Sequence, residues 1–343
     1  MKKQQATEYM YASARISALE THMVGRERVG VLVEAKGRAE VMARLAEFGE
    51  MYRLSVPTDS TDAEGLHKAT EQMLLAVLTG AYKEVGEVAP DPQVYRHFRY
   101  PYDCNNIKAI LKCQIRGVDP DDMLFDFGTL SVDALKEAMR EGKYQLLPPA
   151  MAQGVVEAKE TYAKSGDPQL IDAILDKACY KDMLWAAQAS GSDTLLTWVK
   201  VKIDLVNIMT CLRIIRMKRG EVGKLFMNQV LLDGGYLPLS FFAEVYDGGE
   251  DGLWQGLAYG RYHGLVSAVE AGNKSLAMVE KCADDSYMAV VREGARVPFG
   301  VEVAGGYLLG TETAVKNIRI ILAAKDAGLS AAVIRERMRE SYV

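Results

Sequence analysis

The chain has 343 residues, of which 49% are apolar and 25% are charged, as in an ordinary water-soluble protein. Its 41 basic and 46 acidic side chains leave a net charge of -5, so no excess of positive charge is available to bind nucleic acid. The five cysteines form no CxxC pair, which favours reduced thiols, and the start of the chain lacks the apolar stretch of a signal peptide. No window approaches about eighteen uninterrupted apolar residues, so we expect membrane contact only through a partner.

The dominant hydrophobic period along the chain is helical. Apolar residues recur three and four apart, with charges on the opposite face, and alternating strand-like stretches are few. The ten prolines fall between these stretches, where helices should start or stop. The pattern predicts an all-α protein with helices over residues 15–24, 71–78, 170–184, 195–217 and 312–325.

Two short segments look like entries to new domains. Residues 144–149 and 234–238 both combine an aromatic residue, leucine and proline. They divide the chain into three similar helical domains in tandem, which we expect at residues 1–143, 144–233 and 234–343.

A short pattern occurs three times, about a hundred residues apart. It reads Asn-Ile, three variable residues and Leu, and it begins at Asn106, Asn207 and Asn317. The chain has six asparagines, so half of them stand in this context. A period of this length is too long for a solenoid repeat and suits three related domains. It therefore predicts three equivalent helices and approximate threefold symmetry.

The repeated asparagine needs a hydrogen-bonding partner, because an unsatisfied amide on an apolar helix costs stability. For Asn106 we expect a place in the first helical turn, with Asp103 as the N-cap after Pro101. Asn207 is expected in the middle of its helix, one turn after Asp204. We favour a structural role, in which each amide satisfies the backbone of a neighbouring helix. Binding of a ligand is the alternative.

Catalytic motifs are nearly absent. Residues 220–225 and 272–275 are the strings closest to a phosphate-binding loop, and they lack its spacing or its hydroxyl residue. The four histidines lie far apart without metal-ligand spacing. Residues 247–252 begin like a calcium loop, but the twelfth position is Ala258, which favours an acidic, flexible loop. We therefore predict no catalytic residue, no cofactor and no metal site.

Two features are compatible with a binding surface. Glycines recur every four residues from Gly252 to Gly264 and on a helix would let another backbone approach, with packing inside the third domain as the favoured role. A basic cluster follows the second repeat and is the candidate interface for an acidic partner or a phospholipid surface, with a solvated helix end as the alternative. The basic cluster consists of Arg213, Arg216, Lys218, Arg219 and Lys224.

The adjacent Asp284 and Asp285, by contrast, should point apart on a solvated helix face.

Five segments, spread over nearly the whole chain, carry a family resemblance through their order and spacing. They contain Tyr11-Ala-Ser-Ala-Arg15, Asp103-Cys-Asn-Asn106, Ile171-Asp-Ala-Ile-Leu175, Ile203-Asp204-Leu-Val-Asn207 and Lys316-Asn317-Ile-Arg319. Together they resemble the C-type component of bacterial and archaeal V-type or A-type rotary ATPases, which corresponds to the d-type component in eukaryotes.

This resemblance implies a funnel of three helical domains around a pseudo-threefold axis. It implies a non-catalytic adaptor of the central stalk, which couples the rotating shaft, made of D-type and F-type subunits, to the membrane rotor ring for proton or sodium transport. ATP synthesis or hydrolysis would reside in other subunits. The expected place is the cytoplasmic face of the cell membrane, without contact to nucleic acid. A helical scaffold protein, or a helical enzyme whose site forms only in three dimensions, is the alternative.

Overall fold

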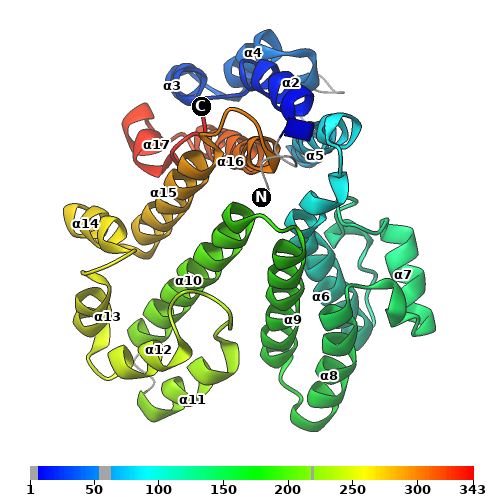
Figure 1. The fold of residues 1–343 in the computed structure, drawn as a ribbon, viewed down its shortest axis with the longest axis vertical. Coiled ribbons are helices and arrows are strands. Elements are labelled where there is room, and N and C mark those ends of the chain that lie inside the picture. The colour runs from blue at the N-terminus through cyan, green and yellow to red at the C-terminus, as the bar shows by residue number, and fades with distance from the viewer. Residues whose placement is uncertain (1–6, 54–62, 218–219) are drawn as a thin grey trace. The chain divides into compact units, whose positions relative to one another are not determined.

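The computed structural model of the chain describes residues 7–53, 63–217 and 220–343. Over these residues every regular element is a helix, which confirms the predicted all-α fold (Figure 1). Within the same ranges, no helix combines the length and the apolar character needed to cross a lipid bilayer.

The segments with helical periodicity all fall on helices of the structure. The first helix ends at Glu20, earlier than predicted, and each of the others begins before the predicted stretch. Proline marks helix starts as expected, for example Pro168 at the first position of its helix, where a backbone N–H would have no acceptor inside the helix. In chain order these helices are α2 (Met10–Glu20), α5 (Ala63–Val88), α9 (Pro168–Ala189), α10 (Asp193–Arg216) and α16 (Val301–Asp326).

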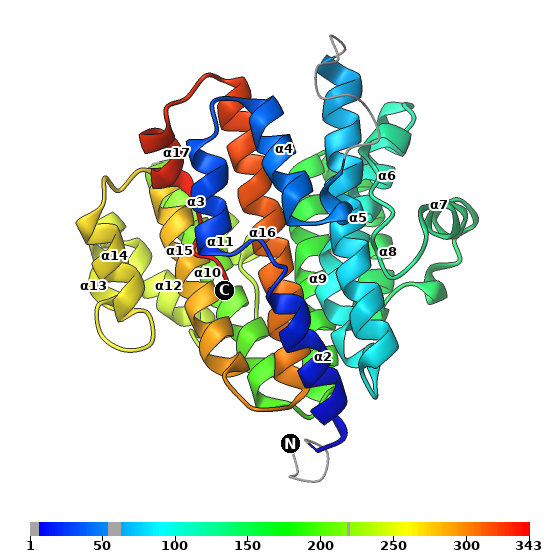
Figure 2. The same cartoon turned by 90° about the horizontal axis from the view of Figure 1, so that it is seen from above.

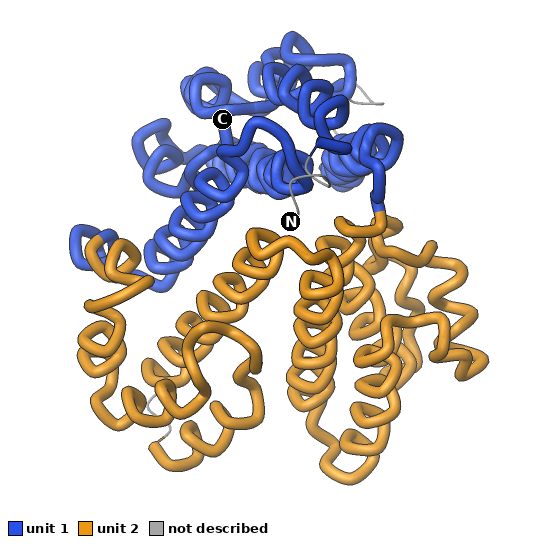
Figure 3. The backbone as a smooth tube through the Cα atoms, in the orientation of Figure 1, with its two compact units in different colours: residues 1–92, 268–343 blue, residues 93–267 orange. Residues whose placement is uncertain are grey.

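The helices group into two compact units (Figure 3). Unit 1 contains residues 1–92 and 268–343, so it joins the first and last parts of the chain, and unit 2 contains residues 93–267. These limits differ from those of the three predicted domains. The threefold division and the funnel remain predictions.

Unit 1 is organised around α16, which lies between α5 and α15 in Figure 2 and also contacts α2. Apolar side chains are buried on nearly every face of α16, as expected for a helix inside a core. On its outer side, Arg319 pairs with Glu71 of α5 at 2.7 Å. The other elements of unit 1 are α3 (Arg26–Glu34), α4 (Arg38–Phe48), η1 (Glu50–Tyr52), α15 (Leu276–Ala295) and α17 (Ala331–Arg337).

Unit 2 is organised around α9, which forms a hairpin with α8 and also contacts α6 and α10 (Figure 1). The two hairpin helices approach closely at Gly154, where an added Cβ would lie 2.9 Å from the Cβ of Ala178. Across to α6, Asp172 pairs with Lys112 at 2.6 Å. The other elements are η2 (Pro92–Arg99), α6 (Tyr100–Arg116), η3 (Asp121–Met123), α7 (Val132–Glu141), η4 (Tyr144–Leu146), α8 (Pro149–Ser165), α11 (Gly220–Val230), α12 (Leu239–Tyr246), α13 (Gly249–Leu257) and α14 (His263–Ala271), whose last residues belong to unit 1.

The glycines of residues 252–264 do not lie on one helix, so the predicted stripe is wrong. α13 ends at Leu257, and Gly260 adopts a φ of +107°, which is incompatible with a continuous helix. Within α13 the glycines do allow close packing against α12: a Cβ on Gly252 would lie 2.9 Å from the carbonyl oxygen of Val245. The glycines that stand four residues apart therefore have different roles: Gly252 allows α13 to pack against α12, and Gly260 lies in a turn.

Candidate functional site

Asn106, on α6, holds the backbone of the segment that follows its own helix. Its Nδ2 donates to the carbonyl oxygen of Phe125 at 2.8 Å, and the Phe125 N–H donates to its Oδ1 at 3.0 Å. One turn earlier, the Asp103 carboxylate accepts hydrogen bonds from the Thr129 N–H at 2.8 Å and from the Thr129 hydroxyl at 2.6 Å. The predicted N-cap role of Asp103 is wrong, because α6 begins at Tyr100 and places this side chain inside the helix.

Asn207, on α10, makes the same pair of hydrogen bonds. Its Nδ2 donates to the Leu232 carbonyl oxygen at 2.8 Å, and the Leu232 N–H donates to its Oδ1 at 2.8 Å. The Asp204 carboxylate accepts from the N–H groups of Tyr236 at 2.9 Å and Leu237 at 3.1 Å. We call the two amide hydrogen bonds an Asn clasp and the carboxylate one turn earlier its Asp anchor.

The first two clasps have the same register. In both, the first backbone group bound by the Asp anchor lies four residues after the residue bound by the asparagine. The bound segments read Leu-Phe-Asp-Phe-Gly-Thr-Leu at 124–130 and Leu-Leu-Asp-Gly-Gly-Tyr-Leu at 231–237. Gly128 and Gly235 occupy the same place, and a Cβ on either would overlap the carboxylate of the anchor. Glycine is therefore a requirement of the close approach between segment and helix.

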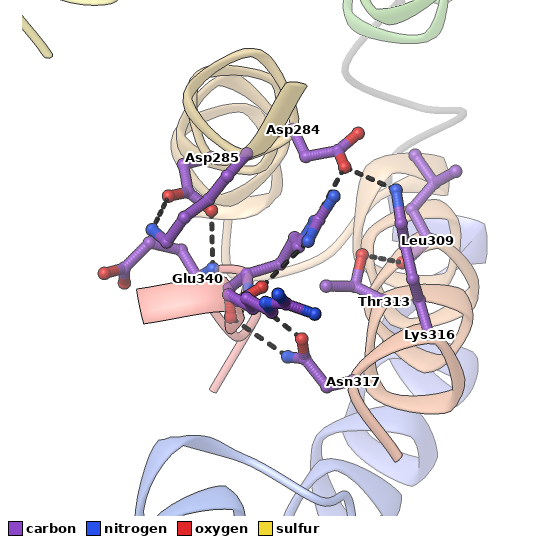
Figure 4. Close-up of polar contacts among 10 residues, drawn as sticks. Asp284, Asp285, Leu309, Thr313, Lys316, Asn317 and Glu340 are labelled. Carbon is purple, nitrogen blue, oxygen red and sulfur yellow. Dashed lines mark hydrogen bonds and ion pairs between the residues drawn. The ribbon is translucent and has the colours of Figure 1, made fainter. Parts of the chain in front are cut away.

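Asn317, on α16, forms a third clasp with a different anchor. Its Nδ2 donates to the Arg339 carbonyl oxygen at 3.0 Å, and the Arg339 N–H donates to its Oδ1 at 2.9 Å. The position one turn earlier is Ala314, which offers no carboxylate. Instead α15 supplies Asp285, whose Oδ1 accepts from the Glu340 N–H at 2.7 Å (Figure 4).

Asp284 and Asp285 therefore do not form the solvated face that their adjacency predicted. They do point apart on α15, but each meets a different partner (Figure 4). Asp284 accepts from Nε of Arg339 at 3.0 Å and pairs with Lys316, whereas Asp285 pairs with Lys281 at 2.5 Å. Helical periodicity gave their directions correctly, but it carried no information about the elements packed on either side.

All three clasp asparagines are nearly excluded from solvent, at 1%, 1% and 0% exposure. Each amide pairs both the donor and the acceptor of one residue in an irregular segment, which has no regular partner of its own. The partner is thus a segment after the helix rather than the neighbouring helix that we predicted, because the interior of a helix has no free backbone groups. Burial raises the pKa of the Asp103 and Asp204 carboxyls, against the lowering effect of the hydrogen bonds that they accept.

The sequence-based prediction missed the anchors and the glycines of this arrangement. Asp103 and Asp204 stand three residues before their asparagines, and a Leu-x-Asp-x-Gly-x-Leu pattern occurs later in the chain in each case, beyond α11 in the second. That shared pattern was available in the sequence. By their hydrogen bonds, residues 124–130 and residues 231–237 are structurally equivalent segments. The predicted domain entries had instead treated residues 144–149 and residues 234–238 as equivalent.

The basic cluster is partly paired inside unit 2. Arg216 donates to both carboxylate oxygens of Glu250, at 2.6 Å and 3.0 Å, and Nζ of Lys224 lies 2.6 Å from Asp247. Arg216 and Lys224 therefore already face carboxylates, and a role of the cluster as an interface remains a proposal. The remaining members are Arg213, which is exposed on α10, and Lys218 and Arg219, which lie outside the described residues.

Residues 247–252, which contain the acidic partners of this cluster, do not form the flexible loop that we predicted. α12 ends at Tyr246 and α13 begins at Gly249, so a tight turn connects two helices. Glu250 and Asp251 stand in the first turn of α13, where the helix dipole favours carboxylates.

The four histidines do not converge on one site. His22, His67 and His263 are exposed on separate elements, and His97 is buried, which lowers its pKa to about 4. In the part of the chain that the structure describes, no group of three or more His, Cys, Asp or Glu side chains is placed to hold a metal ion. A hollow of about 370 Å³ between α9, α10 and α11 contains Asp172 and Asp176, but both carboxylates pair with lysines of α6.

The fold and the site define a class: an all-helical protein in which a buried asparagine repeatedly connects a helix to an irregular segment later in the chain. The model of the family described as ATP synthase (C/AC39) subunit matches residues 12–337. The chain belongs to this family, which confirms the resemblance seen in its sequence.

Three relatives illustrate this similarity, and each is named as the C-type component of its ATPase or ATP synthase. The component of the V-type sodium ATPase of Enterococcus hirae is 25% identical over 280 residues, which cover 81% of this chain and 84% of the relative. The component of the A-type ATP synthase of Thermococcus kodakarensis is 25% identical over 346 residues, covering 97% and 91%. The corresponding component of the A-type ATP synthase of Thermococcus gammatolerans is 26% identical over 351 residues, covering 97% and 90%.

Proposed function

We propose that this protein is a non-catalytic adaptor in the central stalk of a V-type or A-type rotary ATPase. It couples a rotating shaft, made of D-type and F-type subunits, to the membrane rotor ring that transports protons or sodium ions. The observation that carries the proposal is the family match over residues 12–337, together with relatives named as C-type components that align over 84% to 91% of their own length.

The clasps suit an adaptor that transmits torque. A rotating connection must be stiff, and irregular segments are ordinarily the mobile parts of a helical protein. In this chain, three such segments are fixed to helices by paired backbone hydrogen bonds. We place the protein at the cytoplasmic face of the cell membrane, where its partners in the complex supply the contact with the bilayer.

The alternatives are a helical scaffold outside rotary motors and a helical enzyme. An enzyme requires reactive groups that converge in a pocket. The carboxylates of the hollow beside α9 are instead paired with lysines, which favours the adaptor. A scaffold would share the fold, and its partners distinguish it from the adaptor.

The test is to tag the chain in its native host and to purify the membrane complex that contains it. We expect the shaft and the ring to copurify, and we expect D-type and F-type subunits to bind the isolated chain without the ring. Membranes depleted of the chain should lose ATP-driven uptake of protons or of sodium, whichever ion the ring transports, and adding the chain back should restore it. A complex without other ATPase components, or ion uptake that is indifferent to the chain, would contradict the proposal.

The isolated protein should be inert toward ATP, because the proposal assigns hydrolysis to other subunits. Phosphate release is measured across a gel-filtration peak of the pure chain, with and without Mg²⁺. Hydrolysis that follows the protein peak and disappears with a point substitution in this chain would favour the enzyme instead.

A further inference from the structure

Residues 338–343 follow α17 and form no regular secondary structure, yet unit 1 binds them along their length. The third clasp pairs both backbone groups of Arg339 with Asn317, at 2.9 Å and 3.0 Å. The Glu340 N–H donates to Asp285 at 2.7 Å, and the Ser341 carbonyl oxygen accepts from Arg292 at 3.2 Å. The segment is therefore held through its backbone, in the manner of a bound peptide.

Tyr342 fills a place on α16 that two glycines create. A Cβ on Gly310 would lie 2.6 Å from the Cβ of Tyr342, and one on Gly306 would lie 2.6 Å from its hydroxyl oxygen. The Glu20 carboxylate of α2 acts on that hydroxyl through its charge, and burial together with this charge raises the pKa of Tyr342. The pocket thus admits an aromatic ring and offers its polar tip an acceptor.

The far end of the segment meets the start of α3. The Val343 carbonyl oxygen accepts from the Arg26 N–H at 2.9 Å, and a Cβ on Gly25 would lie 2.7 Å from the same oxygen. The binding residues come from α2, α3, α15 and α16, so the segment bridges the first and last parts of the chain that make up unit 1.

The third clasp differs from the other two in its use of side chains. Residues 124–130 and 231–237 lead into α7 and α12, and a glycine stands four residues before the next helix in each. The equivalent position of the third segment is Tyr342, whose ring has its own pocket, and Arg339 also pairs with Asp284 through its side chain. Unit 1 therefore binds specific side chains of this segment, those of Arg339 and Tyr342, in addition to its backbone groups.

We propose that unit 1 carries a peptide-binding groove, formed by α2, α3, α15 and α16, in which residues 338–343 are a separable ligand. The class of ligand is an extended peptide that presents arginine, an acidic residue, a small residue, tyrosine and an aliphatic residue in that order. The ligand contacts both chain segments of unit 1, with α3 on one side and α15 and α16 on the other. This inference stands independently of the adaptor function.

The experiment makes the ligand separable in the full chain. A protease site is inserted after Arg337, the protein is folded and then cleaved, and a fluorescent peptide Met-Arg-Glu-Ser-Tyr-Val is added. We expect the peptide to exchange into the groove with one-to-one stoichiometry, read by fluorescence anisotropy. A cleaved chain that never takes up the peptide overturns the proposal.

A second arm uses the chain truncated after Arg337. If it folds, it should bind the same peptide directly, and if it folds poorly, the peptide should restore helical circular dichroism. A truncated chain that ignores the peptide in both assays overturns the proposal.

Matched substitutions test the tyrosine pocket. Gly310→Ala should weaken peptide binding by at least about tenfold, because the new methyl group occupies the space of the ring. Gly80→Ala is the control, since a Cβ at this glycine of α5 has nothing within 4 Å. A peptide with alanine in place of tyrosine should lose affinity to a similar degree. Equal binding of both peptides, or unchanged affinity in the Gly310→Ala variant, overturns the assignment of the pocket.

Discussion

The contribution of a clasp asparagine to the free energy of unfolding depends on how well water reaches the backbone groups that it binds. Leu232 is 3% exposed, whereas Phe125 is 47% exposed, so water can replace the lost amide more easily at Phe125. We expect Asn207→Ala to lower the free energy of unfolding by about 2–4 kcal/mol and Asn106→Ala by about 1–2 kcal/mol. Urea denaturation followed by circular dichroism measures both.

The control for this comparison is Asn105, the exposed neighbour of Asn106 on the same helix. Asn105→Ala should change the free energy of unfolding by no more than about 0.5 kcal/mol. A loss as large as that of Asn106→Ala would mean that the effect comes from the helix and not from the clasp.

His97 should make unfolding depend on pH. Its side chain is fully buried, and burial lowers its pKa to about 4 in the folded protein, below the ordinary histidine value. The unfolded chain therefore binds a proton first as pH falls, so stability is present at pH 7 and is lost between about pH 6.5 and 4, by up to about 3 kcal/mol. His97→Leu should flatten this part of the pH profile. The same substitution at the exposed His67 should leave the profile unchanged, and a flattening there would contradict the assignment.

At the scale of elements, the glycine of the second clasp segment controls how closely the segment approaches α10. Gly235→Ala would push a methyl group into the Asp204 carboxylate and displace the anchor. We expect a loss of about 1–3 kcal/mol in unfolding free energy and faster hydrogen exchange at the amides of Tyr236 and Leu237. Gly86→Ala, at an open position of α5, should be neutral or stabilising. Unchanged exchange at the two amides would show that the anchor tolerates the methyl group.

Helices were readable from the sequence because side-chain spacing reports directly on a face of a helix. The clasps were not, because each asparagine binds a residue 19, 25 or 22 positions further on, and only tertiary packing brings that residue close. Residues 252–264 show the converse error: a spacing of four says nothing about the φ of Gly260. The repeat of Asn106, Asn207 and Asn317 located the site, but it did not reveal the bound segments.

At the scale of the whole molecule, the second clasp crosses the domain boundary predicted from the sequence. Leu232 lies before residue 234, whereas the anchor partners Tyr236 and Leu237 lie after it. The repeat predicted around Asn207 therefore has to contain residues 231–237 as a whole. Unit 1, in turn, joins residues 1–92 with 268–343, an association that hydrophobic periodicity does not encode.

Substitutions in the Arg216–Glu250 pair test whether the basic cluster stabilises unit 2 or binds partner subunits of the complex. Their side chains are 27% and 30% exposed, and two hydrogen bonds connect α10 to α13. Arg216→Glu places two carboxylates together and should cost about 1–3 kcal/mol of stability. Adding Glu250→Arg restores the pair with the charges exchanged between the helices. We expect this double variant to recover both stability and attachment to the shaft and ring, because the structure uses Arg216 internally. A double variant that regains stability but not attachment would instead place an interface on α10.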